Sequence, residues 1–213
     1  MPRFGLIGHP VSHSKSPELF RKAYGGKGEY DLIEGADFEA SWAVFIDRYD
    51  GINITAPFKE LALHKADILS PECMKTGATN LVVKTLEGIK AYNSDYLAVL
   101  EILRPLRGDC SSLAVIGFGG AGKAALAAAE ELGFQTSLYR HNGIKDGVQA
   151  DIVIYTLPRA VEGTDRISCR HLLEANYLDP VLKGHDGYIP GEEWLMAQAR
   201  CGYALLTGEA PEL

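Results

Sequence analysis

The sequence contains only four cysteines, and their spacing does not match that of a known metal-binding or redox motif. Cys73, Cys110, Cys169 and Cys201 lie far apart, and none belongs to a Cys-x-x-Cys pair. This spacing argues against a zinc knuckle, an iron–sulfur site and a thioredoxin motif. We therefore expect reduced, mostly buried thiols and no disulfide framework.

Long hydrophobic runs are absent as well. No apolar stretch approaches the roughly 20 residues that cross a lipid bilayer. The opening segment, MPRFGLIGHPVS, contains too short an apolar stretch for a signal peptide. The sequence therefore predicts a cytoplasmic protein.

Positive charge is in deficit, with 21 Lys and Arg residues against 28 Asp and Glu residues and a net charge of -7. The basic residues are scattered along the chain, so neither nucleic acid nor a membrane surface is an expected partner. A composition that is 46% hydrophobic and 23% charged is typical of a soluble globular protein and excludes disordered and collagen-like classes. A chain of 213 residues can form one large domain or two small ones.

Strand and helix patterns alternate in the first half of the chain. Strands are expected at residues 4–7, 30–34 and 52–54, and a hairpin at residues 81–85 and 88–92. The expected helices run from an N-cap at Ser16, with Pro17 next, to Tyr24; from near Asp37 to the turn at Gly51; from Pro57 onward; and over residues 96–103, capped by Asn93, Ser94 or Asp95. This alternation predicts an α/β fold.

A glycine motif dominates the second half, after a polar connector at residues 104–109. A strand is expected at residues 113–116, and Gly117, Gly119 and Gly122 then form G-x-G-x-x-G at the start of a helix that Gly133 ends. Further strands are expected at residues 135–139 and 151–156. A strand, this motif and a helix in that order predict dinucleotide binding, with the pyrophosphate at the helix N-terminus. A glycine-rich turn without a ligand is the alternative interpretation.

The end of the second strand in this half indicates which dinucleotide is expected. The acidic residue that commonly binds the ribose of NAD is missing there, and the sequence is Leu138, Tyr139, Arg140, His141. An arginine at this point can pair with a 2′-phosphate, which favours NADP over NAD. Alternatively, Arg140 is a solvated surface residue.

Polar residues follow the predicted strands of the first half, where open α/β sheets place their ligands. Ser14 and Ser16 follow the first strand, and Asn53, Thr55 and Lys59 accompany another. Each has an ordinary structural explanation too, as a helix cap, a turn residue or a solvated lysine.

Two further polar residues and a histidine pair leave similar alternatives. Asn80 fits a turn, and Asp95 fits a first-turn acid that favours the helix dipole. His9 and His13 are four residues apart, but Pro10 between them argues against a helical metal face, and no H-E-x-x-H motif occurs. No metal site is expected.

Six segments, taken in order, resemble the shikimate dehydrogenase family: VSHSKSP, NITAPFK, GATN, YNSD, GFGGAGKA and the closing LMAQA with TG beyond it. The resemblance implies an enzyme that interconverts 3-dehydroshikimate and shikimate with NADP(H), a step of aromatic amino-acid (chorismate) biosynthesis. It implies a substrate-binding and catalytic domain at residues 1–96 and a small Rossmann-like NADP-binding domain at residues 97–189. A C-terminal helix within residues 190–213 is expected to return to the substrate domain.

The same resemblance implies roles for individual residues, carried over by matching position. Lys59 is the expected catalytic lysine, and Asp95 is its partner. The residues expected to contact the substrate are Ser14 and Ser16 at its carboxylate, Tyr177 near that carboxylate, and Thr55, Asn80 and Gln198. The residues expected to contact the cofactor are Gly117, Gly119, Gly120, Ala121, Gly122, Arg140 and Gly191.

The sequence also departs from the family pattern. Leu81 follows Asn80 where a hydroxyl residue is common, and Ser94 replaces a threonine before Asp95. In the second half, Tyr139-Arg140-His141 replaces Asn-Arg-Thr, and Ile154-Tyr155-Thr156 replaces Asn-Ala-Thr. Short intervals after Arg140 and after Tyr177 predict that one or more helices of the cofactor domain are trimmed.

Two alternatives to the main interpretation stay open. A quinate or quinate/shikimate dehydrogenase would accept an extra hydroxyl on its substrate and could use NAD. A protein without catalytic activity that binds shikimate or a nucleotide as a sensor would explain a trimmed second half. The expected partner is a small-molecule substrate, and the expected assembly is a monomer or a homodimer.

Overall fold

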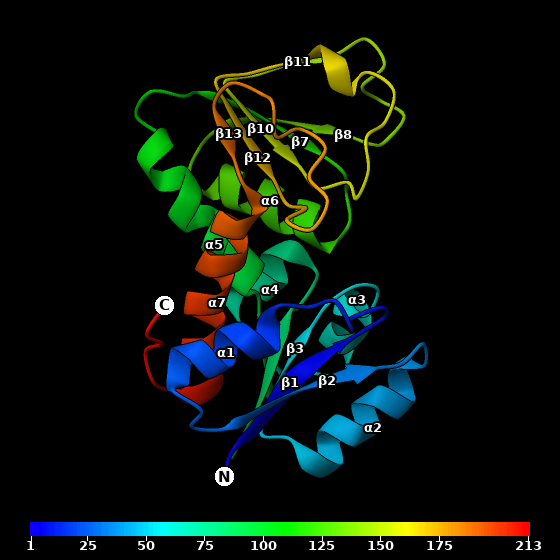
Figure 1. Cartoon of the computed structure of the whole chain (residues 1–213), viewed down its shortest axis with the longest axis vertical. Helices are drawn as coiled ribbons and strands as arrows, with labels where there is room; N and C mark the ends of the chain where they lie inside the picture. Colours follow the sequence, from blue (N-terminus) through cyan, green and yellow to red (C-terminus); the bar gives the residue numbers. More distant parts are fainter. The chain divides into compact units, whose positions relative to one another are not determined.

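The computed structural model describes all 213 residues, which form two compact units (Figure 1). Unit 1 consists of Met1–Ser94 and Gln198–Leu213, and unit 2 consists of Asp95–Ala197. Each unit has its own β-sheet. The predicted α/β fold is confirmed, as is the return of the C-terminal helix to the first unit. No helix is both long enough and apolar enough to cross a membrane.

Unit 1 is built on a mixed six-stranded sheet with the order β2-β1-β3-β5-β6-β4. Its strands are β1 (Arg3–Gly8), β2 (Glu29–Glu34), β3 (Gly51–Ile54), β4 (Ile68–Leu69), β5 (Leu81–Thr85) and β6 (Gly88–Tyr92). Its helices are α1 (Ser16–Tyr24), α2 (Phe38–Arg48), α3 (Lys59–His64), α4 (Pro71–Thr76) and the second part of α7 (Gly191–Thr207). The predicted strands and hairpin are confirmed, whereas the sequence pattern did not predict β4 and α4.

Strand pairing brings the ends of four strands to one edge of this sheet. β1 and β3 are parallel, with Ile7 opposite Ile54, and β5 runs antiparallel to β3, with Leu81 opposite Asn53. β6 is antiparallel to β5, so Tyr92 at the end of β6 also lies opposite Leu81. The carboxyl ends of β1, β3 and β6 and the amino end of β5 therefore share one edge, where ligands of open α/β sheets bind.

The starts of two helices differ from those predicted. Ser16 is the first residue of α1 and not its cap; Lys15 holds the cap position with helical backbone angles. The side chain of Ser14 accepts the backbone N–H of Ser16 at 3.2 Å, so a hydroxyl two residues earlier satisfies a donor that the helix leaves unpaired. Similarly, α3 begins at Lys59 and not at Pro57, because the chain first makes a turn in which Phe58 N–H donates to the carbonyl of Thr55 at 3.0 Å.

Aromatic side chains join the second part of α7 to unit 1. Tyr203 of α7 is 1% exposed, and its ring centroid lies 5.2 Å from that of Phe20 in α1 in an edge-on arrangement. Phe4 and Leu206 belong to the same buried cluster. Burial of this apolar area stabilises the fold by roughly 25 cal/mol for each Å² removed from water. The C-terminal segment is therefore part of the core of unit 1.

Unit 2 contains a five-stranded parallel sheet with the order β13-β12-β10-β7-β8. Its strands are β7 (Ser112–Ile116), β8 (Gln135–Tyr139), β10 (Ile152–Tyr155), β12 (His171–Glu174) and β13 (Tyr188–Ile189), and β9 (Val148–Gln149) and β11 (Ile167–Ser168) form a separate pair. The other elements are α5 (Ser94–Leu103), whose first residue belongs to unit 1, α6 (Gly120–Glu131), the first part of α7, and two 3-10 turns, η1 (Arg104–Leu106) and η2 (Thr164–Arg166). β8 and β10, which follow β7 in the chain, lie on opposite sides of β7 in the sheet. The ends of β7 and β10 thus form a topological switch point, where such sheets bind nucleotides.

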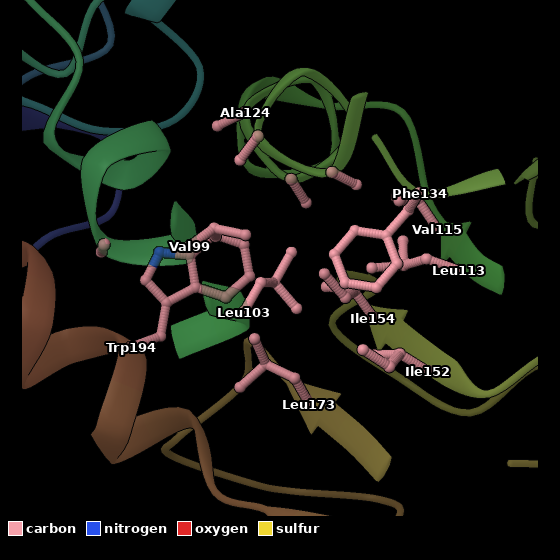
Figure 2. Packing of buried hydrophobic residues seen from close by; sticks show 14 of the residues in the cluster. Val99, Leu103, Leu113, Val115, Ala124, Phe134, Ile152, Ile154, Leu173 and Trp194 are labelled. Atoms are coloured by element: carbon pink, nitrogen blue, oxygen red, sulfur yellow. The ribbon is translucent and has the colours of Figure 1, made fainter. Parts of the chain in front are cut away.

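Three helices bury one face of this sheet. Val99 and Leu103 of α5, Ala124 of α6 and Trp194 of α7 belong to one buried cluster with side chains of the strands (Figure 2). Leu113, Ile152 and Leu173 contribute from β7, β10 and β12 (Figure 2). The first turns of α7 are thus part of the core of unit 2, while its later turns complete unit 1.

Unit 2 has few helices, as the short intervals in the sequence led us to expect. No α-helix lies between α6 and α7; the chain there makes only short strands, one 3-10 turn and loops. Glu174, which is 0% exposed, holds the longest of these loops. Its carboxylate accepts the backbone N–H groups of Val181 at 2.7 Å and Leu182 at 3.1 Å. These two hydrogen bonds attach the loop to the end of β12 and satisfy the buried side chain of Glu174.

The cysteines have the predicted state. All four are free; Cys73 and Cys110 are buried, and Cys169 and Cys201 are half-buried. Burial raises the pKa of the Cys73 thiol to about 11 and has the same effect on Cys169. These two thiols are therefore protonated and poorly nucleophilic at neutral pH.

Asp151 ties the first residues of β7 to the start of β10. Its Oδ2 accepts the backbone N–H groups of Ser111 at 2.9 Å and Ser112 at 3.0 Å, and both serine hydroxyls as well. The backbone N–H groups are the main reason that the pKa of this carboxyl falls below its usual range. A carboxyl with a lowered pKa stabilises the fold above its unfolded pKa, about 3.9, and loses that contribution as the pH falls.

We expect Asp151→Asn to lower the Tm at pH 7, because the amide replaces an acceptor with a donor that faces two N–H groups. The difference in Tm from the parent should narrow below about pH 4, as the unfolded carboxyl becomes protonated. Thermal unfolding at pH 7 and pH 3 measures this. Asp165→Asn, at a side chain that is 80% exposed, is the control. A difference in Tm that is independent of pH would contradict the assignment.

Candidate functional site

The sheet edge formed by the carboxyl ends of β1, β3 and β6 and the amino end of β5 is called the ligand edge of unit 1. Most of the residues expected to contact the substrate lie at this edge. Thr55 N–H donates to the carbonyl of Ile7 at 2.9 Å, which joins the segments beyond β3 and β1. Thr79 N–H donates to the carbonyl of Lys59 at 3.1 Å, which places Lys59 beside the segment that leads into β5. Residues that are distant in the sequence thus meet because of strand register.

Ser14 and Ser16 form a hydroxyl pair. The hydroxyl of Ser14 donates to that of Ser16 at 3.2 Å, and Ser16 is 8% exposed. Tyr203 of α7 donates its hydroxyl to the carbonyl of Ser16 at 2.9 Å and so fixes the backbone at this point. Two fixed hydroxyl groups at hydrogen-bonding distance can donate to the two oxygens of one carboxylate.

Asn80 and Gln198 meet through a residue that sequence reasoning did not assign to the site. Ser94 donates its backbone N–H to Asn80 Oδ1 at 2.7 Å, accepts from Asn80 Nδ2 at 2.9 Å, and donates its hydroxyl to Gln198 Oε1 at 3.3 Å. The three side chains therefore share one network. The YNSD segment contains Ser94, but the hydroxyl's role depends on α7, which the sequence does not place.

Two other residues hold this network in position. A Cβ added to Gly202 would lie 3.0 Å from the hydroxyl oxygen of Ser94, so glycine allows α7 to approach closely. Asn53, which is 7% exposed, donates to the carbonyl of Asn80 at 3.2 Å and accepts from the hydroxyl of Tyr30 at 2.9 Å. Burial raises the pKa of Tyr30 well above its usual value, which keeps this phenol a donor.

Two of the expected site residues lie in the first turns of helices. Lys59 is the first residue of α3 in unit 1, and its side chain is half-buried. Asp95 lies in the first turn of α5 in unit 2, where it favours the helix dipole, and it is 9% exposed. Tyr177 is half-buried in the loop after β12, also in unit 2.

The glycine motif of unit 2 has the steric features of a dinucleotide loop. Gly117 has a φ of +102°, which side chains rarely adopt, and a Cβ there would lie 2.3 Å from Thr156 Oγ1. A Cβ on Gly122 would lie 2.2 Å from the carbonyl oxygen of Gly117. Nothing lies within 4 Å of a Cβ built on Gly119, so this glycine leaves open space directly before α6. Tight turn, close packing and open approach are the three roles of these glycines in nucleotide-binding folds.

The other residues expected to contact the cofactor lie around this loop or at the start of α7. Gly120 and Ala121 are the first residues of α6. Arg140 follows β8 directly, and its guanidinium carbon lies 5.8 Å from the ring centroid of Phe118. Gly191 is buried at the start of α7, where a Cβ would lie 2.7 Å from the carbonyl oxygen of Glu174. Close packing therefore explains a glycine at position 191 without a ligand.

The residues present fit a dinucleotide. The open space at Gly119 admits a pyrophosphate to the backbone N–H groups that begin α6. Arg140, one residue after β8, stands where a 2′-phosphate would need a cation. No group of three or more His, Cys, Asp or Glu side chains is placed to hold a metal ion.

Known proteins are similar to this chain in sequence. Residues 6–82 match the family model of the shikimate dehydrogenase substrate binding domain. The shikimate dehydrogenase (NADP(+)) of Thermus thermophilus is 35% identical over 149 residues, which is 63% of this chain and 54% of the relative. That of Dinoroseobacter shibae is 35% identical over 144 residues, 62% of this chain and 52% of the relative. The matched region thus spans about half the length of these curated relatives.

Solved structures agree in fold over a greater length. The shikimate 5-dehydrogenase of Thermus thermophilus in complex with NADP(H) and shikimate has a TM-score of 0.83 at 24% identity, over 100% of this chain and 95% of that one. The shikimate dehydrogenase of Mycobacterium tuberculosis has a TM-score of 0.80 at 25% identity, with the same coverage. The resemblance found in the sequence is confirmed.

Proposed function

Because this chain has the fold and the substrate-binding domain of the shikimate dehydrogenase family, we propose that it reduces 3-dehydroshikimate reversibly to shikimate with NADPH. The observation that carries the proposal is the ligand edge of unit 1. There, the Ser14 and Ser16 hydroxyls and the Asn80–Ser94–Gln198 network present fixed neutral donors and acceptors. A small polyhydroxy acid needs such groups to fix which ring carbon reacts.

The substrate would be held by its carboxylate and its hydroxyls. Ser14 and Ser16 would donate to the carboxylate, and Tyr177 would lie near it. Thr55, Asn80 and Gln198 would bind ring hydroxyls. Since Ser94 already links Asn80 and Gln198, their amides have little rotational freedom. Little side-chain entropy is then lost when the substrate binds.

Lys59 would act as the acid and base of the reaction. Reduction of the ketone places negative charge on the carbonyl oxygen, and the Lys59 ammonium would stabilise this charge and deliver the proton to that oxygen. In the reverse direction, the amine of Lys59 would take the proton from the substrate hydroxyl. Asp95 would orient the lysine. NADPH, when bound, supplies the hydride.

The cofactor would be held by the glycine loop and by Arg140. The space at Gly119 and the first residues of α6, Gly120 and Ala121, would accept the pyrophosphate, and Gly117 and Gly122 would shape the turn. The guanidinium of Arg140 would pair with the 2′-phosphate. We place the reaction in the cytoplasm, without a nucleic-acid or membrane partner; a monomer or a homodimer would serve it.

The decisive experiment follows the absorbance of reduced nicotinamide after the purified protein is mixed with shikimate and NADP⁺. Parallel reactions use NAD⁺ and quinate. Reduction of NADP⁺ that depends on shikimate is the expected result. Faster reduction with quinate would favour a quinate/shikimate dehydrogenase. If folded protein binds shikimate but shows no turnover in any mixture, the proposal is contradicted and a sensor is favoured. The observation that favours a sensor is that unit 2 has no α-helix between α6 and α7.

We expect Arg140→Ala to raise the KM for NADP⁺ roughly tenfold or more, because a charge-assisted hydrogen bond to the 2′-phosphate is lost. The KM for NAD⁺ should change little, since NAD⁺ lacks that phosphate. Initial rates with both cofactors measure the effect. Arg48→Ala, at a surface arginine that is 62% exposed, is the control. Equal changes with both cofactors would remove the assignment.

A further inference from the structure

One of the residues expected to contact the substrate lies in a loop. Tyr177 belongs to the segment of unit 2 between β12, which ends at Glu174, and β13, which begins at Tyr188. Its neighbour Leu178 is 49% exposed, so burial does little to fix this part of the loop. A segment with few buried contacts opens easily unless hydrogen bonds hold its backbone. The hydrogen bonds of this loop therefore determine where Tyr177 lies.

Glu174 closes the loop at its base. Its carboxylate reaches seven and eight residues along the chain, where it accepts Val181 N–H at 2.7 Å and Leu182 N–H at 3.1 Å. The hydroxyl of Tyr188 donates to the same carboxylate at 3.2 Å. Burial and the nearby carboxylate raise the pKa of Tyr188 to about 12, so this phenol stays a donor at neutral pH. One side chain that is 0% exposed thus joins the start of the loop to its end.

Asn176 shapes the turn that contains Tyr177. Its Oδ1 accepts the N–H groups of the two residues after Tyr177, Leu178 at 3.1 Å and Asp179 at 3.2 Å. Its Nδ2 donates to the carbonyl of Asp179 at 2.6 Å and to that of Pro158 at 3.3 Å. Pro158 lies in the segment after β10, so this bond attaches the turn to a second loop. Asparagine side chains that bond to the backbone two residues on are typical of turns.

Hydrogen bonds thus hold the backbone on both sides of Tyr177. Before it, Ala175 N–H donates to the carbonyl of Tyr155 in β10 at 2.8 Å. After it, the N–H of Leu178 is held by Asn176. A loop that is ordered before its ligand arrives loses little conformational entropy on binding, so more of the energy of each contact appears as affinity.

We propose that Glu174 and Asn176 are positioning residues that hold Tyr177 for its contact with the carboxylate of the substrate. Both act through the backbone of the loop, and neither is among the residues expected to contact the substrate. The inference rests on the proposed role of Tyr177 and deepens it, because it names the two side chains on which that role depends.

The test measures the affinity for shikimate by calorimetry, with no cofactor present and therefore no turnover. Tyr177→Phe should weaken binding about tenfold, because it removes a hydrogen bond to a charged group. Asn176→Ala should weaken binding roughly three- to tenfold, because the loop must then become ordered as shikimate binds. Glu174→Gln should act in the same direction, because its amide nitrogen would face a backbone N–H group.

A double variant separates positioning from a general loss of stability. In the Tyr177→Phe protein, the further change Asn176→Ala should weaken shikimate binding less than about twofold, because residues that act as one unit are not additive. Binding of adenosine 2′,5′-bisphosphate, a fragment of NADP, should stay within about twofold of the parent in Asn176→Ala, as expected for independent sites. The control is Asn142→Ala, at an exposed asparagine in another loop of unit 2, which should change neither affinity.

Three outcomes would overturn the positioning role. They are parental affinity for shikimate in Asn176→Ala, additive losses in the double variant, and parental affinity in Tyr177→Phe, which would leave no contact to position. Equal weakening of shikimate and of the fragment, with a lower Tm, would show a structural role only and would overturn it too. A parent protein that binds shikimate with these responses but does not oxidise it would refute only the proposed reaction.

Discussion

Replacing Lys59 with alanine is expected to lower kcat for shikimate oxidation about a thousandfold, while the KM for shikimate changes only a few-fold. General acid and base catalysis by a positioned side chain contributes roughly 10² to 10⁴ in rate. The ammonium would act on charge that develops only in the transition state, so its loss appears mainly in kcat. Steady-state kinetics with shikimate and NADP⁺ measure both constants.

The backbone at this position should tolerate the change. Lys59 begins α3, and its structural contact with Thr79 is made by its carbonyl, which alanine retains. Lys65→Ala is the matched control, because Lys65 is the C-cap of the same helix and pairs on the surface with Glu39 at 2.8 Å. Near-parental turnover in Lys59→Ala, or an equal loss in Lys65→Ala, would refute the catalytic role.

Gly122→Ala is expected to destabilise unit 2 by about 3 kcal/mol, a typical upper figure for overpacking. The added Cβ would lie 2.2 Å from the carbonyl oxygen of Gly117, a backbone atom that cannot move without disturbing the turn. Thermal unfolding should show a decrease in Tm of roughly 10 °C. Dinucleotide binding should be lost as well, because the start of α6 would be displaced.

Gly119→Ala provides the comparison within the same loop. A Cβ there meets nothing within 4 Å, so its Tm should match that of the parent. The same methyl group would occupy the space proposed for the pyrophosphate, so affinity for NADP⁺ should still fall. If Gly119→Ala keeps the parental affinity for NADP⁺, the cofactor does not bind at this loop. If Gly122→Ala keeps the parental Tm, the close packing at this turn is contradicted.

Local sequence signals were sufficient where a segment forms its structure from its own residues. The hairpin of β5 and β6 has the predicted bounds, because alternating apolar residues and a two-residue turn determine it. β12 and β13 were not predicted. β12 has only four residues and is held by parallel neighbours on both sides, and short strands of this kind depend on tertiary pairing.

The prediction of helix starts failed for a related reason. A serine before a proline is typical of a cap, yet the donor at the start of α1 is satisfied by Ser14, two residues before Ser16. By contrast, α2 starts near Asp37 as expected, and the Asp37 carboxylate caps it by accepting from Glu39 N–H at 2.9 Å. The pattern identifies a capping side chain but not which of two nearby hydroxyls takes the role.

The residues of the candidate site also divide into those that local motifs predict and those whose roles depend on distant segments. Motif resemblance identified Asn80 and Gln198 separately, and strand register with the placement of α7 explains why both contact Ser94. The buried roles of Ser94 and Asn53 could not be predicted, because each depends on partners from distant segments. The contact between Phe118 and Arg140 could not be predicted for the same reason: the ring and the guanidinium become neighbours only when β7 pairs with β8.

The division of α7 between two cores bears on how the chain folds during synthesis. Tyr203 and Leu206, which complete the buried cluster around Phe4 and Phe20, leave the ribosome only after all of unit 2. At about 5 to 20 residues per second, the first unit waits several seconds with that apolar face uncovered. Unit 2 is complete at Ala197, before the last residues of unit 1 are made, so it can fold earlier. The segment made first is therefore completed last, and the nascent chain is most vulnerable to aggregation at its N-terminal aromatic face.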